Sequence, residues 1–112
     1  MNGKPAAWFL AIGSLVAFGA HAADAKVVAY FEETCGACHG PKGDGIAGLA
    51  PPLKGSAFVK SAKPEDVAAV ISKGRAGDQK KFPQMPSPMP PHSMSDGRLK
   101  AIVAYLQDEI QK

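Results

Sequence analysis

The sequence predicts an all-α domain, on two observations. Three stretches carry apolar residues at helical spacing, and none of the chain shows the apolar and polar alternation of a half-buried β-strand over four or more residues. Segments rich in glycine and proline separate the three stretches and are typical of loops. The chain has 112 residues, which is enough for one small domain.

Residues 1–22 are predicted to be a secretory signal peptide. Lys4 precedes the uncharged run Pro5–Ala20, and Ala20-His21-Ala22 supplies small residues at the two positions that a signal peptidase reads. An uncleaved membrane anchor is the alternative, but the run is shorter than the roughly 20 residues of a spanning helix. We therefore expect residues 23–112 to fold as a single domain in the periplasm, with no membrane span after cleavage.

A domain this small needs stabilisation beyond its own core, which rarely supplies more than about 3–5 kcal/mol. A disulfide between Cys35 and Cys38 would close a very short loop and would restrain the unfolded chain little. A bound cofactor would add buried apolar surface that the polypeptide does not have to provide. The length of the domain therefore favours a cofactor at its centre.

The first predicted helix runs from about Ala25 to Thr34. Asp24 is a suitable N-cap residue, because its carboxylate can accept a hydrogen bond from a free backbone N–H of the first turn. The apolar face consists of Val27, Val28 and Phe31. This helix brings Cys35 to its C-terminal end.

The second predicted helix begins at Pro64 and ends at Gly74, residue types that favour the first turn and the C-terminus of a helix. Its apolar residues are Val67, Val70 and Ile71. The third predicted helix follows the N-cap Ser95, and its apolar stripe consists of Leu99, Ile102, Val103, Leu106 and Ile110. Residues 40–58 and 78–94 are predicted to be irregular, and wrapping around a planar cofactor is one explanation for loops this long in so small a domain.

The motif Cys35-Gly36-Ala37-Cys38-His39 fits three chemistries: a metal clip, a thiol–disulfide centre or covalent haem attachment. A structural zinc site needs about four ligands, usually from two cysteine pairs, and the chain has only two cysteines. A thioredoxin-like centre would follow a strand, whereas this motif follows a predicted helix. Haem attachment uses every member: each thiol forms a thioether, and the imidazole becomes an axial iron ligand. We therefore predict one covalent haem c.

The second axial ligand is expected in the proline-rich segment 78–94. The candidate side chains there are Met85, Met89, His92 and Met94. Prolines restrict the backbone and can hold a thioether against iron without a regular element to support it. The alternative for this segment, a polyproline ligand of a signalling module, does not suit an exported chain. Reasoning from the residues alone leaves the four candidates open.

Three stretches, FEETCGACHG, APPLKG and PMPPHSMSDGRLKAIVAYL, together resemble the class I c-type cytochromes in order and spacing. The resemblance covers nearly all of residues 23–112. It implies a cytochrome c fold with about three main helices and long loops wrapped around one covalently attached haem. It also implies that Met89, in the Met-Pro-Pro unit before the last helix, is the second axial ligand, with Met85 as the runner-up.

The same resemblance implies that the backbone carbonyl of Pro51 accepts a hydrogen bond from His39, and that Phe31 and Tyr105 pack where the first and last helices cross. Two departures stand out. Val27 occupies a position where the family commonly has a small residue, so a wider or shifted crossing is expected. The only tryptophan, Trp8, lies in the predicted signal peptide, so the indole that binds a haem propionate in some relatives is missing.

With His39 and Met89 both bound, the iron has no open position for a substrate. A thioether ligand favours reduced iron and raises the potential relative to a second histidine. The expected protein is thus a one-electron carrier without its own catalytic residues, exchanging electrons with larger redox proteins through transient contacts. Its charge is nearly balanced, with 13 basic and 10 acidic residues, which does not indicate nucleic-acid binding.

The predicted docking residues come from a locally basic part of the chain and are Lys73, Arg75, Lys80 and Lys81. Three other functions remain open. The chain could be the haem c subunit of a multi-subunit oxidoreductase, for example one oxidising sulfur compounds or an alcohol. It could be an enzyme or sensor in which Met89 leaves the iron to admit a small ligand. It could also be a haem-free dithiol oxidoreductase.

Overall fold

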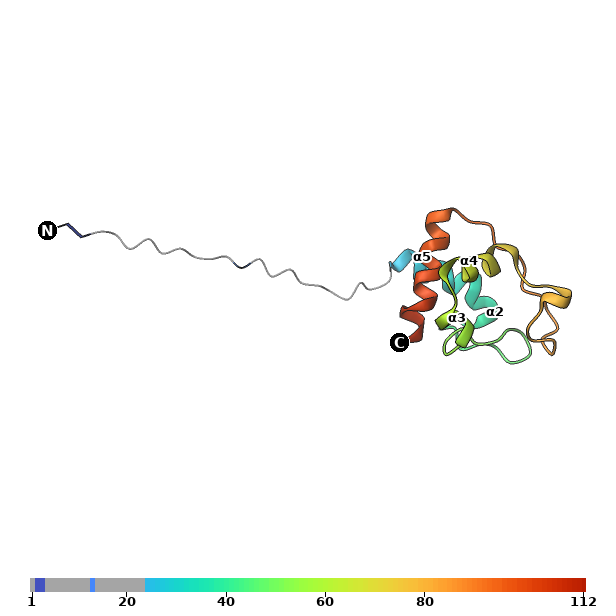
Figure 1. The fold of residues 1–112 in the computed structure, drawn as a ribbon. Coiled ribbons are helices and arrows are strands. Elements are labelled where there is room, and N and C mark those ends of the chain that lie inside the picture. Colours follow the sequence, from blue (N-terminus) through green and yellow to red (C-terminus); the bar gives the residue numbers. More distant parts are fainter. Residues whose placement is uncertain (1, 4–12, 14–23) are drawn as a thin grey trace.

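The computed structural model describes residues 2–3, 13 and 24–112. Of the predicted signal peptide, residues 1–22, only residues 2, 3 and 13 are therefore described, and its cleavage stays a prediction. The α-helices are α1 (Ala25–Tyr30), α2 (Gly36–His39), α3 (Ala57–Ser61), α4 (Pro64–Lys73) and α5 (Asp96–Gln107), as Figure 1 shows. In the described ranges β-pairing is limited to two isolated bridges, which confirms the all-α class.

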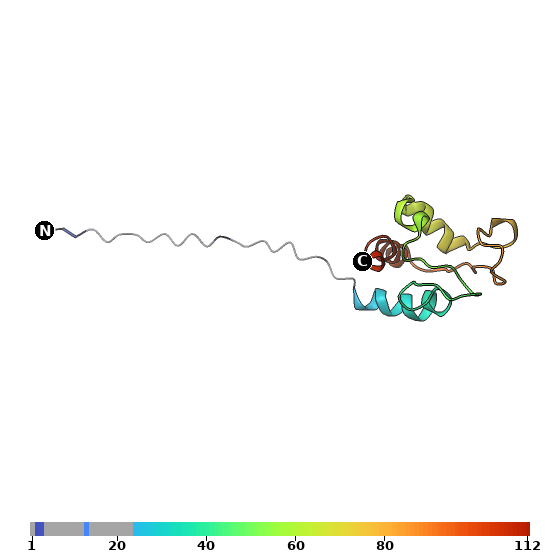
Figure 2. The same cartoon turned by 90° about the horizontal axis from the view of Figure 1, so that it is seen from below.

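Residues 24–112 also contain three short turns of helix. A π-helical turn, η1 (Phe31–Cys35), joins α1 to α2, and two 3₁₀ turns, η2 (Gly77–Gln79) and η3 (Glu109–Gln111), follow α4 and α5. Helix α5 lies between the α1–α2 segment and α4, as the view in Figure 2 shows, and it contacts α1, α3 and α4. The proline-rich segment, drawn in orange, extends on the side of the domain away from α5.

The first helical segment starts as predicted and ends later than predicted. The carboxylate of Asp24 accepts a hydrogen bond from the backbone N–H of Lys26 at 2.9 Å, which confirms the cap. Instead of ending at Thr34, the helix widens into the π turn, in which Gly36 N–H donates to Phe31 O, and then continues as α2. Glycine at position 36 allows Pro41 to pack closely against this segment, because a Cβ at Gly36 would come 3.0 Å from Pro41 Cα.

The hydrophobic core gathers around α5. Its buried members are Phe31, Val59, Val67, Ile71, Ile102, Val103, Leu106 and Ile110. The rings of Phe31 and Tyr105 lie with centroids 5.3 Å apart and planes tilted by 59°, a favourable aromatic geometry. This pair confirms the predicted aromatic contact between the first and last helices.

Helix α4 begins at Pro64 and is closed by Gly74 with φ +69°, and Ser95 caps α5 by accepting a hydrogen bond from Arg98 N, as predicted. Helix α3, by contrast, lies partly in a segment predicted to be irregular. The hydroxyl of Ser56 caps it, and the side-chain amide of Gln107 donates to the carbonyls of Val59 and Ala62. Since five residues form a marginal helix alone, these tertiary contacts from α5 stabilise α3.

Within residues 24–112 and the few others described, none of the helices has the length and apolar character needed to cross a bilayer.

Candidate haem site

The two cysteines lie on one helical turn and are not joined to each other. Cys35 ends the π turn and is half-buried, whereas Cys38 lies in α2 and is exposed. Burial, reinforced by the neighbouring Cys38, raises the pKa of the Cys35 thiol to about 11. A thiol–disulfide centre needs a thiolate at neutral pH and therefore a lowered pKa. The surroundings of Cys35 thus disfavour the dithiol oxidoreductase considered above.

His39 is oriented by a hydrogen bond to the loop that follows it. Its Nδ1 lies 2.7 Å from the carbonyl oxygen of Pro51, and because a carbonyl can only accept, Nδ1 carries the proton. The lone pair is then on Nε2, the atom available to a metal. Burial lowers the pKa of His39, the Pro51 hydrogen bond partly opposes this shift, and repulsion from His92 adds to it. The neutral imidazole, the form that binds iron, is thereby favoured.

The carbonyl of Pro51 is held in place by a tight loop over residues 40–55. The backbone N–H of Gly45 donates to His39 O at 2.7 Å, and Ile46 pairs with Ala50 across a turn. Gly45 has φ +80°, and a Cβ there would come 2.7 Å from Pro52 N. Only glycine therefore permits the chain before Ile46 to approach Pro52 this closely.

Met89 is fixed through its backbone to the residue after α4. Arg75 N–H donates to Met89 O and Met89 N–H donates to Arg75 O, each at 2.9 Å. A Cβ at Gly74 would overlap Met89 O and lie 2.8 Å from Pro90 C, so the closeness of the two segments depends on glycine. The side chain of Met89 is half-buried and packs against the core.

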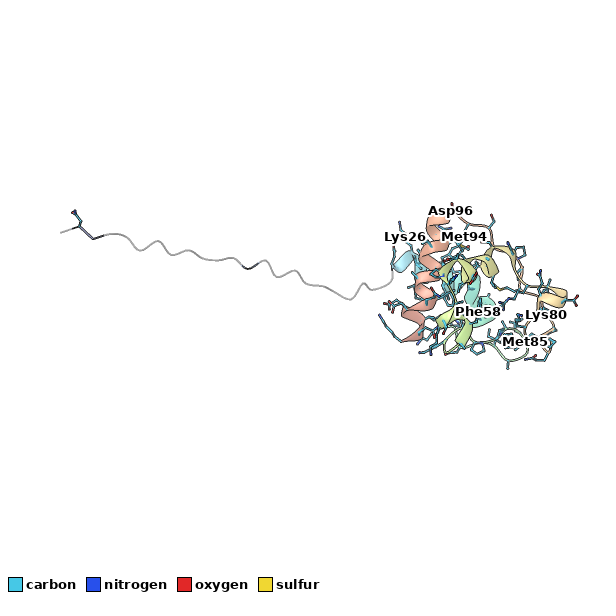
Figure 3. All side chains as sticks on the ribbon, in the orientation of Figure 1. Lys26, Phe58, Lys80, Met85, Met94 and Asp96 are labelled. Carbon is cyan, nitrogen blue, oxygen red and sulfur yellow. The ribbon has the colours of Figure 1, made fainter. Side chains whose placement is uncertain are left out.

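The other candidate ligands lie in different surroundings. Met85 is half-buried, and Lys80 Nζ donates to its backbone oxygen; Figure 3 shows both residues near the outer end of the proline-rich loop. Met94 packs against the core beside the start of α5. His92 is half-buried, and its backbone N–H donates to Ile71 O at 2.9 Å. Among the methionines that the structure describes, Met89 is thus the one with both a paired backbone and a core contact.

Three large apolar side chains remain exposed on segments around this region. Ile46, Phe58 and Phe82 keep 38%, 39% and 43% of their surface accessible. Together with two unbridged thiols, an imidazole with a free Nε2 and a half-buried thioether, they are the residue types that a covalently attached haem would contact. In the described part of the chain, no group of three or more His, Cys, Asp and Glu side chains could hold a metal ion by itself.

Three of the four predicted docking residues share one surface. Lys73, Arg75 and Lys81 line a shallow groove at the C-terminal end of α4. The Arg75 guanidinium also lies 5.0 Å from the centre of the Phe58 ring, a cation–π distance. Lys80 does not line this groove, because its ammonium group is turned toward the carbonyl of Met85.

Sequence reasoning did not identify two glycines that build the site. The sequence predicts only that Gly74 ends a helix and that residues 40–58, which include Gly45, are irregular. Their roles depend on residues that lie far away in sequence, namely Met89 for Gly74 and Pro52 for Gly45. The only local signals are that Gly74 begins the stretch GRAGD and that Gly45 lies in the glycine- and proline-rich segment 40–58.

Comparison with known proteins agrees with this geometry. The model of the Cytochrome c family matches residues 25–108, which is well over half of the chain. Among solved structures, a c-type cytochrome NirC is similar, with a TM-score of 0.53 and 24% sequence identity over 76% of this chain and 88% of that one. At that identity the likeness shows the fold. A sequence comparison with curated proteins finds no significant match.

The chain therefore belongs to the cytochrome c family. Members of this family bind haem c covalently, and the single Cys-x-x-Cys-His motif fits one such group. The family generally carries electrons rather than catalysing reactions, and c-type cytochromes are generally exported. Electron transfer through a covalent haem c is thus the function that the family assigns.

Proposed function

We propose that this protein is a periplasmic one-electron carrier in which His39 and Met89 would be the two protein ligands of the haem iron. One observation carries the proposal: separate hydrogen bonds to the backbone hold the His39 ring and the main chain of Met89. His39 is oriented by Pro51 O at 2.7 Å, which leaves Nε2 free, and Met89 is locked to Arg75 by two hydrogen bonds of 2.9 Å. Each ligand is thereby preorganised before iron binds.

The thiols of Cys35 and Cys38 would hold the haem through thioethers, and the haem, when bound, supplies an iron that gains and loses one electron. The chain's own residues set the conditions. The Pro51 carbonyl keeps the His39 proton on Nδ1 and makes the ring a stronger electron donor. The thioether of Met89 favours the reduced state. With both positions taken, substrate has no access to the metal.

Docking is proposed at the groove lined by Lys73, Arg75 and Lys81, which we call the basic groove. The groove contains no carboxylate among its lining residues, and Arg75 is bonded directly to the Met89 backbone. A partner with an acidic surface would therefore be attracted to a point next to the proposed iron ligand. We expect Lys80, although predicted with this group, to contribute less to docking, because its ammonium group donates a hydrogen bond to Met85 O.

The experiment that tests the carrier role is an optical titration of protein expressed with haem attachment machinery. The proposal expects a sharp α-band on reduction, a weak near-infrared charge-transfer band from methionine sulfur to ferric iron, and no reaction of the reduced form with carbon monoxide. Rapid carbon monoxide binding would instead support an enzyme or sensor with a labile Met89. Stable co-purification with a catalytic subunit would support the haem subunit of a larger oxidoreductase.

A further inference from the structure

The C-terminal 3₁₀ turn η3 contains a side chain, Gln111, that forms hydrogen bonds with the loop over residues 40–55, which carries Pro51. Gln111 Nε2 donates to Leu53 O at 3.0 Å and to Leu106 O at 2.9 Å, and its Oε1 accepts from Gly55 N–H at 2.7 Å. Both N–H donors of the amide and one acceptor position of its oxygen are therefore used. Two of these bonds join the end of the chain to residues 53–55, which lie more than fifty positions earlier.

Residues 53–55 are in turn tied to the beginning of the same loop. The backbone N–H groups of Leu53 and Lys54 both donate to Gly43 O, at 2.8 and 3.0 Å. Gly43 has φ +74°, and a Cβ there would overlap the side chain of Ile110. The loop is thus fastened to η3 at two neighbouring points, by packing on Ile110 and by hydrogen bonds to Gln111.

Pro51 lies between this anchor and the haem motif. It precedes Leu53 by two residues, and its carbonyl accepts the 2.7 Å hydrogen bond from His39 Nδ1. On its other side, Gly45 contacts the Pro51–Pro52 peptide closely and donates to His39 O. Displacement of residues 53–55 would therefore be transmitted to the carbonyl that orients the imidazole, over a short and conformationally restricted path.

We propose that Gln111 is a positioning residue for His39: by tying residues 53–55 to the C-terminal turn, it holds the Pro51 carbonyl against the imidazole and thereby lowers the reduction potential of the haem. The inference rests on the proposed function in that it takes His39 as an axial ligand. A well-formed N–H···O=C bond increases the electron donation of the ring, which stabilises ferric iron more than ferrous iron. Loosening the bond should therefore raise the potential.

The chain offers a matched control. Gln107 also donates two amide hydrogen bonds to backbone carbonyls, those of Val59 and Ala62, at 3.1 and 2.9 Å. Both acceptors belong to α3 or directly follow it, and neither lies in the loop that carries Pro51. Gln107→Ala removes comparable contacts between the C-terminal region and the body of the domain, but it leaves the anchor at residues 53–55 intact.

The test compares haem-loaded wild type, Gln111→Ala and Gln107→Ala by spectroelectrochemical titration, thermal unfolding and proton NMR of the His39 Nδ1 proton in the reduced protein. We expect both variants to unfold at lower temperature. Only Gln111→Ala should show a higher midpoint potential and faster exchange of the Nδ1 proton with solvent deuterium. Unchanged potential and exchange in Gln111→Ala, or equal changes in Gln107→Ala, would overturn the positioning role.

A second variant keeps the proposal testable if Gln111→Ala does not fold. Gln111→Glu keeps an oxygen that can accept from Gly55 N–H, but its carboxylate cannot donate to Leu53 O. If Gln111→Ala does not retain haem, Gln111→Glu should show the same upward shift in potential, and its absence would overturn the proposal. The comparison does not depend on the second ligand. A wrong assignment of Met89 would appear separately, as a near-infrared band that persists in Met89→Ala.

Discussion

Arg75 and Met89 exchange two backbone hydrogen bonds of 2.9 Å, so the proposed sulfur ligand is fixed by the residue that directly follows α4 and its closing glycine. The arrangement links the end of a helix to a segment without regular structure. It also pairs the backbone of Arg75, whose guanidinium lies over the Phe58 ring, with the backbone of the proposed ligand.

Gly74→Ala should therefore displace Met89 and abolish the near-infrared sulfur-to-iron band. A Cβ would overlap Met89 O and lie 2.8 Å from Pro91 N. The backbone angles of Gly74, φ +69° and ψ −173°, add a penalty of about 1–3 kcal/mol for a residue with a side chain. Gly77→Ala is the control, because Gly77 has φ +54° but open space around its Cβ position. It should lose stability and keep the band. Retention of the band in Gly74→Ala would contradict the account.

Met89→Ala should abolish the same band and open the iron to carbon monoxide, since the sulfur ligand is removed. Met94→Ala serves as the control: Met94 also packs against the core, so its truncation should lower the free energy of unfolding and leave the optical spectrum unchanged. Spectra of ferric protein and of the reduced protein under carbon monoxide provide the measurement. If Met85→Ala removes the band and Met89→Ala does not, the ligand is Met85.

Neutralising the basic groove should slow electron exchange with anions. Replacing Lys73 or Lys81 by glutamine is expected to reduce the rate of oxidation by hexacyanoferrate(III) by roughly a few-fold at low ionic strength, with the difference vanishing in high salt. Lys26→Gln is the control, because Lys26 belongs to α1 and Figure 3 shows it on the side of the domain away from Lys80 and the proline-rich loop. Stopped-flow absorbance measures the rate. If wild type and the Lys73 and Lys81 variants are oxidised at equal rates at every ionic strength, steering by this groove is refuted.

Stability should fall at alkaline pH partly through Tyr105. Burial, with smaller contributions from Glu32 and Glu109, raises the pKa of its hydroxyl above the ordinary value. The folded state thus retains the proton more firmly than the unfolded state. The resulting stabilisation is complete below the unfolded pKa of about 10 and is lost as pH rises through the folded pKa.

The measurement is chemical denaturation of wild type and Tyr105→Phe from pH 8 upward to the alkaline limit of the assay. The ring remains available to pack against Phe31 in the variant, so the two proteins should differ chiefly in how steeply stability falls with pH. Wild type should fall more steeply above about pH 10. Parallel curves would show that ionisation of Tyr105 is not coupled to folding.

The sequence predicted elements that depend on local signals. Pro64, Gly74 and Ser95 mark helix ends by their own backbone and side-chain chemistry, and the α4 and α5 boundaries follow them. The haem motif is likewise complete within five consecutive residues. Such features do not require knowledge of which distant segments meet.

The features that the sequence did not reveal depend on distant contacts. Helix α3 is stabilised by Gln107, which lies in another helix, and the π turn that carries Cys35 is not signalled by the spacing of apolar residues. Lys80 could not be separated from Lys81 without knowing that its ammonium group reaches Met85 O. Gly45 and Gln111 acquire their roles only when the loop around Pro51 closes on both His39 and the C-terminus.

The most direct test of the account is the intact mass of the mature protein, purified after expression with haem attachment machinery and denatured before measurement. The account predicts the mass of residues 23–112 plus one haem, with the haem recovered on the peptide that contains Cys35 and Cys38. Replacing both cysteines by alanine should remove the added mass. A wild-type protein no heavier than its polypeptide would contradict the central claim.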